Sequence, residues 1–123
     1  MYSLTLPYPP SLNSLYKIAP KPYPHIYLSA KGKEYKKLVN EYIYTNNLVL
    51  RANIPLSVTI VITPPDNRKR DLDNLFKILF DSLTGAEFWE DDVYIKALNV
   101  SYKEPNKPGG LLLTIKPLED YGV

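Results

Sequence analysis

The chain has 123 residues, of which 45% are hydrophobic and 23% are charged, and its formal net charge is +2. This length fits one domain with a core of its own, and so weak a net charge does not by itself require a nucleic-acid partner. Because the chain has no cysteine, disulfide bonds, thiolate zinc sites and thiol catalysis are excluded.

The first 28 residues combine a short strand with a proline-rich segment. Tyr2 to Leu6 is rich in strand formers, which predicts a first strand. Residues 7–25 then hold six prolines, a density that neither a helix nor a central strand tolerates. We therefore expect a long irregular loop. Two interpretations of it stay open, a stiff surface loop and a loop that contacts a ligand.

A helix is predicted from about Ala30 to Asn46, with Ser29 as its N-cap. Its apolar side chains recur at steps of three and four residues and form one stripe: Tyr35, Leu38, Val39, Tyr42 and Ile43. Four lysines between residues 31 and 37 lie mostly off that stripe. Such a lysine-rich face is usually only solvated, and contact with DNA is the alternative.

Three further strands and a second helix complete the chain. Leu56 to Thr63 is β-branched and bounded by prolines, which predicts a strand, and Asp71 to Leu83 predicts a helix with one apolar stripe. Val93 to Lys103 and Leu111 to Lys116 predict two more strands, and the turn residues between them favour a hairpin. This order predicts a mixed α/β (α+β) domain over residues 1–123. It would have one mixed sheet of about four strands and two main helices.

Two aspartates at the start of the second predicted helix can act together. In the body of a helix a step of two residues turns about 200°, so Asp71 and Asp73 would face apart. At the helix entrance Asp71 can be the cap while Asp73 lies in the first turn, so both carboxylates can converge. Lys77 follows Asp73 by four residues and shares its face. A later acidic cluster, residues 90–92, lies where a loop could fold it back onto this site.

The basic run Arg68-Lys69-Arg70 comes directly before Asp71. Cations beside clustered carboxylates suit a phosphodiester substrate, because arginines hold phosphates and carboxylates hold Mg²⁺, a hard ion that prefers oxygen ligands. Such an ion polarises the phosphate and makes a bound water a better nucleophile. The alternative is structural, since Asp-x-Asp at a helix start is ordinary capping and the basic run can be a surface ion-pair patch. The spacing alone leaves both interpretations open.

These residues occur in an order that resembles the RusA family of Holliday-junction resolvases. The resembling blocks are Leu4 to Lys17, Pro65 to Leu75 with Lys77, Phe80 to Thr84, Phe88 to Asp92, and Gly109 to Leu111. They cover most of the chain with spacing similar to that of the family. The chain departs from the family's pattern at Glu87, where the family often has a glycine just before the aromatic residue.

The resemblance implies a small homodimeric enzyme that binds four-way DNA junctions and nicks two opposed strands symmetrically. It implies Mg²⁺ as the cofactor, or Mn²⁺ in its place. The family's essential carboxylates map onto Asp71, Asp73 and Asp92, and its important lysine maps onto Lys77. Asp91 adjoins the third carboxylate and is a further candidate metal ligand.

Basic and aromatic side chains are the candidates for DNA contact. The family has an arginine-rich segment directly before its first essential carboxylate, and the run Arg68, Lys69 and Arg70 matches it. Tyr16 and Lys17 lie in the resembling N-terminal block, and basic and aromatic side chains on loops commonly serve backbone and base contacts. Trp89 is expected to be an apolar anchor beside the acidic cluster, with stacking on DNA as the alternative.

Two other functions stay open beside resolution of junctions. One is a protein that binds branched DNA without cutting it, and the other is a metal-dependent nuclease for flaps or single strands. We expect no membrane partner and no nucleotide cofactor. Residues 1–7 lack the build of a signal peptide, and no apolar run approaches the ~20 residues of a membrane helix, so we expect a cytoplasmic protein.

Overall fold

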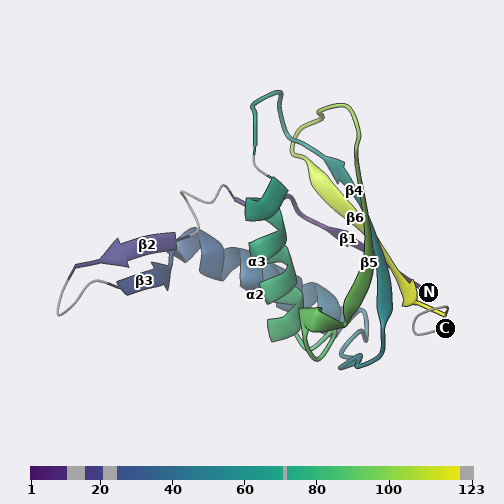
Figure 1. Ribbon diagram of the computed structural model, residues 1–123. Coiled ribbons are helices and arrows are strands. Elements are labelled where there is room, and N and C mark those ends of the chain that lie inside the picture. Colours follow the sequence, from purple (N-terminus) through teal and green to yellow (C-terminus); the bar gives the residue numbers. More distant parts are fainter. Residues whose placement is uncertain (11–15, 21–24, 71, 120–123) are drawn as a thin grey trace.

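A computed structural model describes residues 1–10, 16–20, 25–70 and 72–119 of the chain (Figure 1). Its main sheet has four strands: β1 (Tyr2–Leu6), β4 (Leu56–Thr63), β5 (Ile95–Tyr102) and β6 (Gly110–Pro117). Two helices, α2 (Ala30–Thr45) and α3 (Leu72–Gly85), lie on one side of this sheet, and a 3-10 turn, η1 (Asp92–Tyr94), leads into β5. The predicted mixed α/β architecture is confirmed. Neither described helix combines the length and the apolarity needed to cross a membrane.

β4 is an inner strand of the main sheet, whose strand order is β1-β6-β4-β5. It pairs in parallel with β5 and antiparallel with β6. The predicted hairpin between the last two strands is therefore wrong, because β5 and β6 lie on opposite edges of β4. Parallel neighbours need a crossover connection, and α3 provides it between β4 and β5. The chain then passes the end of β4 to reach the other edge.

The core fills the space between this sheet and the two helices. Every second residue of β4 is buried, as strand geometry requires. The predicted stripe of α2 is confirmed for Tyr35, Val39 and Ile43, whereas Leu38 at its margin is 43% exposed. The stripe predicted for α3 was Leu72, Leu75, Phe76, Leu79 and Leu83. Leu75, Leu79 and Leu83 are buried, whereas Leu72 and Phe76 are partly buried. Ile78 is buried as well, because α3 packs against α2 and shares one core with the sheet.

Two short strands form where an irregular loop was predicted. β2 (Tyr16–Ala19) and β3 (His25–Leu28) pair antiparallel in a separate sheet. Neither strand contains a proline, since the prolines of this segment come before β2 or between the two strands. The prediction of a continuous irregular loop is wrong because a proline count over the whole segment hid two short stretches of strand formers. The hairpin projects away from the main sheet (Figure 1).

Three strands of the main sheet end at the same edge. β1 and β4 both run antiparallel to β6, and β5 runs parallel to β4, so these three strands share one direction. Their carboxyl ends, at Leu6, Thr63 and Tyr102, therefore lie at one edge of the sheet, where Figure 1 shows the upper loops. In open α/β sheets, ligands bind beyond the carboxyl ends of the strands.

The loop from β5 to β6 is fastened to the end of β4. The amide of Asn106 donates a hydrogen bond to the carbonyl of Pro64 at 2.9 Å. Gly109 has a φ of +81°, and a Cβ added there would lie 2.9 Å from the Thr63 carbonyl oxygen and from the Pro65 nitrogen. This contact requires glycine, so the loop and the chain that follows β4 are packed backbone against backbone.

Candidate active site

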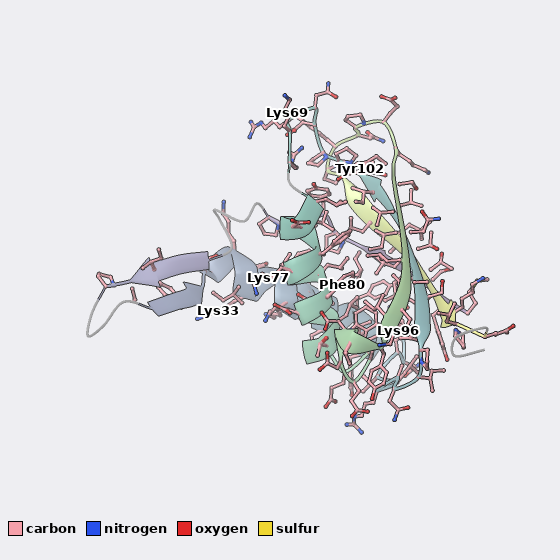
Figure 2. All side chains as sticks on the ribbon, in the orientation of Figure 1. Lys33, Lys69, Lys77, Phe80, Lys96 and Tyr102 are labelled. Atoms are coloured by element: carbon pink, nitrogen blue, oxygen red, sulfur yellow. The ribbon has the colours of Figure 1, made fainter. Side chains whose placement is uncertain are left out.

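Charged side chains follow one face of α3. Asp73 is exposed in the first turn, and Lys77 and Asp81 follow at steps of four residues. The Lys77 Nζ lies 3.7 Å from the Asp81 Oδ2; the Lys77 side chain is mostly exposed and the Asp81 side chain about half-buried. Figure 2 labels Lys77 halfway along the helix. The helical spacing that places Asp73 and Lys77 on one face is thus present.

Asp71, the predicted cap of this helix, lies outside the described residues. The structure describes α3 from Leu72 onwards, and the helix runs to Gly85, two residues beyond the predicted end. The convergence of the Asp71 and Asp73 carboxylates therefore stays a prediction.

The late acidic pair lies at the start of η1. Asp91 is the cap, and its Oδ1 accepts a hydrogen bond from the amide of Val93 at 3.0 Å. This bond, together with a hydrogen bond shared with Asp92, lowers the pKa of the Asp91 carboxyl. The pKa of Asp92 is raised, first by partial burial and then by the hydrogen bond with Asp91 and the charges of Asp91 and Asp81. Asp91 and Asp92 therefore lie next to each other, and the charge of Asp81 on α3 reaches Asp92.

Most of the length of α3 separates Asp73 from Asp81 and from the acidic pair Asp91 and Asp92. Asp81 follows Asp73 by two full i+4 steps, which is roughly 12 Å along the helix axis. The loop thus folds Asp92 back onto α3, and it does so near Asp81. In the part of the chain that the structure describes, no three acidic, histidine or cysteine side chains gather closely enough to hold a metal ion. Within one chain, Asp73 therefore lies at the start of α3, whereas Asp91 and Asp92 lie near its C-terminal half.

Phe88 and Trp89 anchor the acidic pair. Both rings are buried, with their centroids 5.6 Å apart in an edge-to-face arrangement. The indole Nε1 of Trp89 donates a hydrogen bond to the Thr84 Oγ1 at 2.7 Å. The expectation that Trp89 is an apolar anchor is confirmed. Its complete burial rules out the alternative of stacking on DNA in this conformation.

Glu87 precedes these rings with a φ of +62°, in the left-handed region that glycine adopts most easily. A glycine at this position, as the family resemblance led us to expect, would adopt this φ without strain. A non-glycine residue in this region costs about 1–2 kcal/mol. The ion pair between Glu87 and Arg51, at 3.1 Å, is exposed and offsets little of that cost.

The three basic residues ahead of α3 differ in their surroundings. The Arg70 side chain is only 26% exposed, its guanidinium lies 2.7 Å from the Asp66 Oδ1, and it stacks over the Tyr8 ring at 5.5 Å. The Arg68 side chain is 85% exposed and lies 3.8 Å from the same carboxylate. Lys69 is exposed in the loop above the start of α3 (Figure 2). Arg70 is therefore fixed, while Arg68 and Lys69 are accessible to phosphates.

Asp66 organises this loop, although the sequence analysis did not single it out. Its carboxylate accepts a hydrogen bond from the amide of Arg68 at 2.9 Å. That bond and the side chain of Arg70 lower the pKa of Asp66. The available signal was the four-residue step from Asp66 to Arg70, which predicts a contact inside a helix but not in a loop.

Tyr16 and Lys17 begin β2, in the hairpin that projects from the main sheet. The positions of their side chains lie outside the described residues, so their contact with DNA stays a prediction.

Carboxylates along one helix, with a basic loop ahead of its first turn, give this surface the charges that a phosphodiester-binding protein needs. The family model described as Endodeoxyribonuclease RusA matches residues 7–116. The chain therefore belongs to the RusA family of endodeoxyribonucleases.

Individual relatives match over nearly the whole chain. The crossover junction endodeoxyribonucleases RusA of Shigella sonnei (strain Ss046) and Escherichia coli (strain K12) are each 40% identical to it over 114 residues, which cover 93% of this chain and 92% of the relative. The protein of that name from Enterobacteria phage HK97 is 39% identical over 111 residues, which cover 90% of this chain and 89% of the relative. The resemblance inferred from the sequence is confirmed.

Proposed function

We propose that this protein is a metal-dependent endodeoxyribonuclease that resolves Holliday junctions by paired symmetric nicks, in DNA recombination and repair. The observation that carries the proposal is the match to junction endonucleases at about 40% identity over nine-tenths of the chain. The charged face of α3 and the basic loop at its entrance supply the chemistry that such an enzyme needs. Its place of action would be the cytoplasm of a bacterium, where the DNA lies.

The donor set suits a hard divalent cation. Carboxylate oxygens are the ligands that Mg²⁺ prefers, and the chain has no thiolate to attract softer metals. We propose Asp71, Asp73 and Asp92 as the ligands of Mg²⁺, or of Mn²⁺ in its place, with Asp91 as a further candidate. When bound, the ion would polarise the scissile phosphate and activate water for in-line attack.

The cationic side chains would bind and orient the DNA strand. Arg68, Lys69 and Arg70 would hold backbone phosphates at the entrance of α3, which fixes the register of the strand. Lys77, one turn further along, would stabilise negative charge that develops on the phosphoryl oxygens. Lys77 lies on the face of α3 that also carries Asp73 and Asp81.

We propose that the protein acts as a homodimer. Two opposed nicks in one junction need two sites related by two-fold symmetry. The separation of Asp73 from Asp92 adds a second reason, since a partner chain could bring its own carboxylate to either position. Val93 in η1 is 60% exposed, and Leu98 on β5 is 43% exposed. Among the described residues β5 is an edge strand that pairs with β4 alone, so these apolar side chains lie where a partner chain could cover them. Light scattering at micromolar concentration should give the dimer mass, and a stable monomer would contradict paired cleavage.

A panel of end-labelled substrates tests the function. Four-way junction, flap, duplex and single strand of matched sequence are incubated with the protein and Mg²⁺. We expect the junction to yield two nicked duplexes while the other substrates stay largely intact. Binding of the junction with no cleavage of any substrate would favour a non-catalytic branch-binding protein. Preferred cleavage of flaps or single strands would favour a different metal-dependent nuclease.

A further inference from the structure

An open pocket of about 380 Å³ lies at the end of the sheet, beyond the carboxyl ends of β1, β4 and β5. Each of these strands contributes to it. Tyr8 follows β1, residues 64, 66–68 and 70 follow β4, and residues 102–105 finish and follow β5. The volume is within the range of about 300–1,000 Å³ that is usual for small-molecule sites. Of the proposed metal ligands, the three that the structure describes, Asp73, Asp91 and Asp92, do not line this pocket.

Tyr102 presents an uncovered aromatic ring to this pocket. It pairs in register with Ile62 on the helix-facing side of the sheet, where Ile62 is completely buried. Tyr102 itself is 54% exposed, because α3 does not cover the upper end of this edge strand (Figure 2). An exposed ring beside cations is the arrangement on which unstacked bases bind, since every base has a π face.

The opposite wall of the pocket is preformed. Arg70 is held by the Asp66 carboxylate at 2.7 Å and by the carbonyls of Asp66 and Arg68 at 3.3 and 3.2 Å. Its guanidinium covers the Tyr8 ring. Burial raises the pKa of the Tyr8 phenol, the charge of Arg70 acts against this rise, and the proximity of Tyr102 adds to it. A wall fixed by so many contacts loses little conformational entropy when a ligand arrives.

The charges around the pocket fit a whole nucleotide better than a phosphate alone. Arg68 and Lys103 provide cations for a phosphate group. Asp66 and Glu104 line the same pocket, and carboxylates repel a phosphate. Base edges carry N–H donors, however, and carboxylates accept hydrogen bonds from them.

We propose that this pocket holds one unstacked nucleotide of the bound DNA strand, with its base on the Tyr102 ring and its phosphate beside Arg68 and Lys103. A base inside a duplex must lose its stacking to enter, whereas a base at a branch point is released at lower cost. The pocket would thus favour strands near the crossover of a junction. The inference rests on the proposed function, because it needs a DNA strand at the entrance of α3.

Substitution of Tyr102 tests the stacking. Tyr102→Leu keeps an apolar side chain on the strand but removes the ring, Tyr102→Phe keeps the ring, and Tyr44→Leu removes a tyrosine that is 76% exposed on α2. The affinity of each variant for a fluorescently labelled oligothymidylate of twelve nucleotides is measured by fluorescence anisotropy at one salt concentration. We expect Tyr102→Leu to weaken binding by at least roughly fivefold, the lower bound for the loss of one stacked base. Tyr102→Phe and Tyr44→Leu should bind as the unsubstituted protein does.

Photo-crosslinking tests the position of the nucleotide. Junctions that carry 5-iodo-2′-deoxyuridine at successive positions around the crossover should crosslink to the tryptic peptide of residues 97–103, which contains Tyr102. Tyr102→Leu should abolish this crosslink. If Tyr102→Leu binds and crosslinks as Tyr44→Leu does, while the unsubstituted protein cuts junctions, the pocket inference fails and the proposed function stands. If the unsubstituted protein neither binds nor cuts DNA, both fail.

Discussion

Asp73→Asn is expected to reduce junction cleavage more than about 100-fold and to leave junction binding intact. Loss of a group that merely supports a metal ligand costs about 10–100-fold, so loss of a ligand itself should exceed that range. Asparagine keeps the size of the side chain and removes its charge. Because Asp73 is exposed in the first turn of α3, the fold should survive. Junction binding should be equal or tighter, since one negative charge near the phosphates is lost.

The measurement is single-turnover cleavage in Mg²⁺, with binding followed by gel shift without metal. Glu41→Gln is the matched control, because it removes a carboxylate charge from an exposed position on α2. It should cut junctions at the rate of the unsubstituted protein. Full activity of Asp73→Asn would remove Asp73 from the proposed ligands.

A mixture of two inactive variants tests whether Asp73 and Asp92 of one site come from the same chain or from two chains. If one site takes Asp73 from one chain and Asp92 from its partner, a mixed dimer of Asp73→Asn and Asp92→Asn keeps one intact site. Such a mixture should produce singly nicked junctions. If each chain builds its own site, every site in the mixture lacks one ligand and no cleavage should appear.

The features that the sequence predicted well depend on neighbours along the chain. The start of α2 at its Ser29 cap and the common face of Asp73 and Lys77 follow from helical periodicity and capping, which act within a few residues. The resemblance to a nuclease family likewise rested on residue order and spacing, and the family match confirms it.

The features that the sequence missed depend on contacts between distant segments. The pairing of β5 with β4 is set by the α3 crossover and by the need of β4 for partners on both edges. The height of Asp92 along α3 follows from the burial of Phe88 and Trp89. The ion pair between Asp66 and Arg70 forms inside an irregular loop, where residue spacing does not predict which side chains meet.

Gly109→Ala is expected to lower the free energy of unfolding by about 2–4 kcal/mol. A left-handed φ costs an alanine about 1–2 kcal/mol, and the remainder comes from the clash of the new Cβ with the Thr63 carbonyl oxygen and the Pro65 nitrogen, both at 2.9 Å. These are backbone atoms at the end of β4, so no rotation of a side chain relieves the clash. For a domain of this size the melting temperature should fall by about 10 °C.

Gly85→Ala is the matched control in thermal melting, because a Cβ there meets nothing within 4 Å. It should leave the melting temperature unchanged or slightly higher. Gly109→Ala should also weaken junction binding, because the loop of residues 103–109 fastens Tyr102 and Lys103 to the chain that leads into the basic residues. Equal melting temperatures for the two variants would show that this loop shifts freely, and the Tyr8 and Tyr102 sides of the pocket would then not be held in one arrangement.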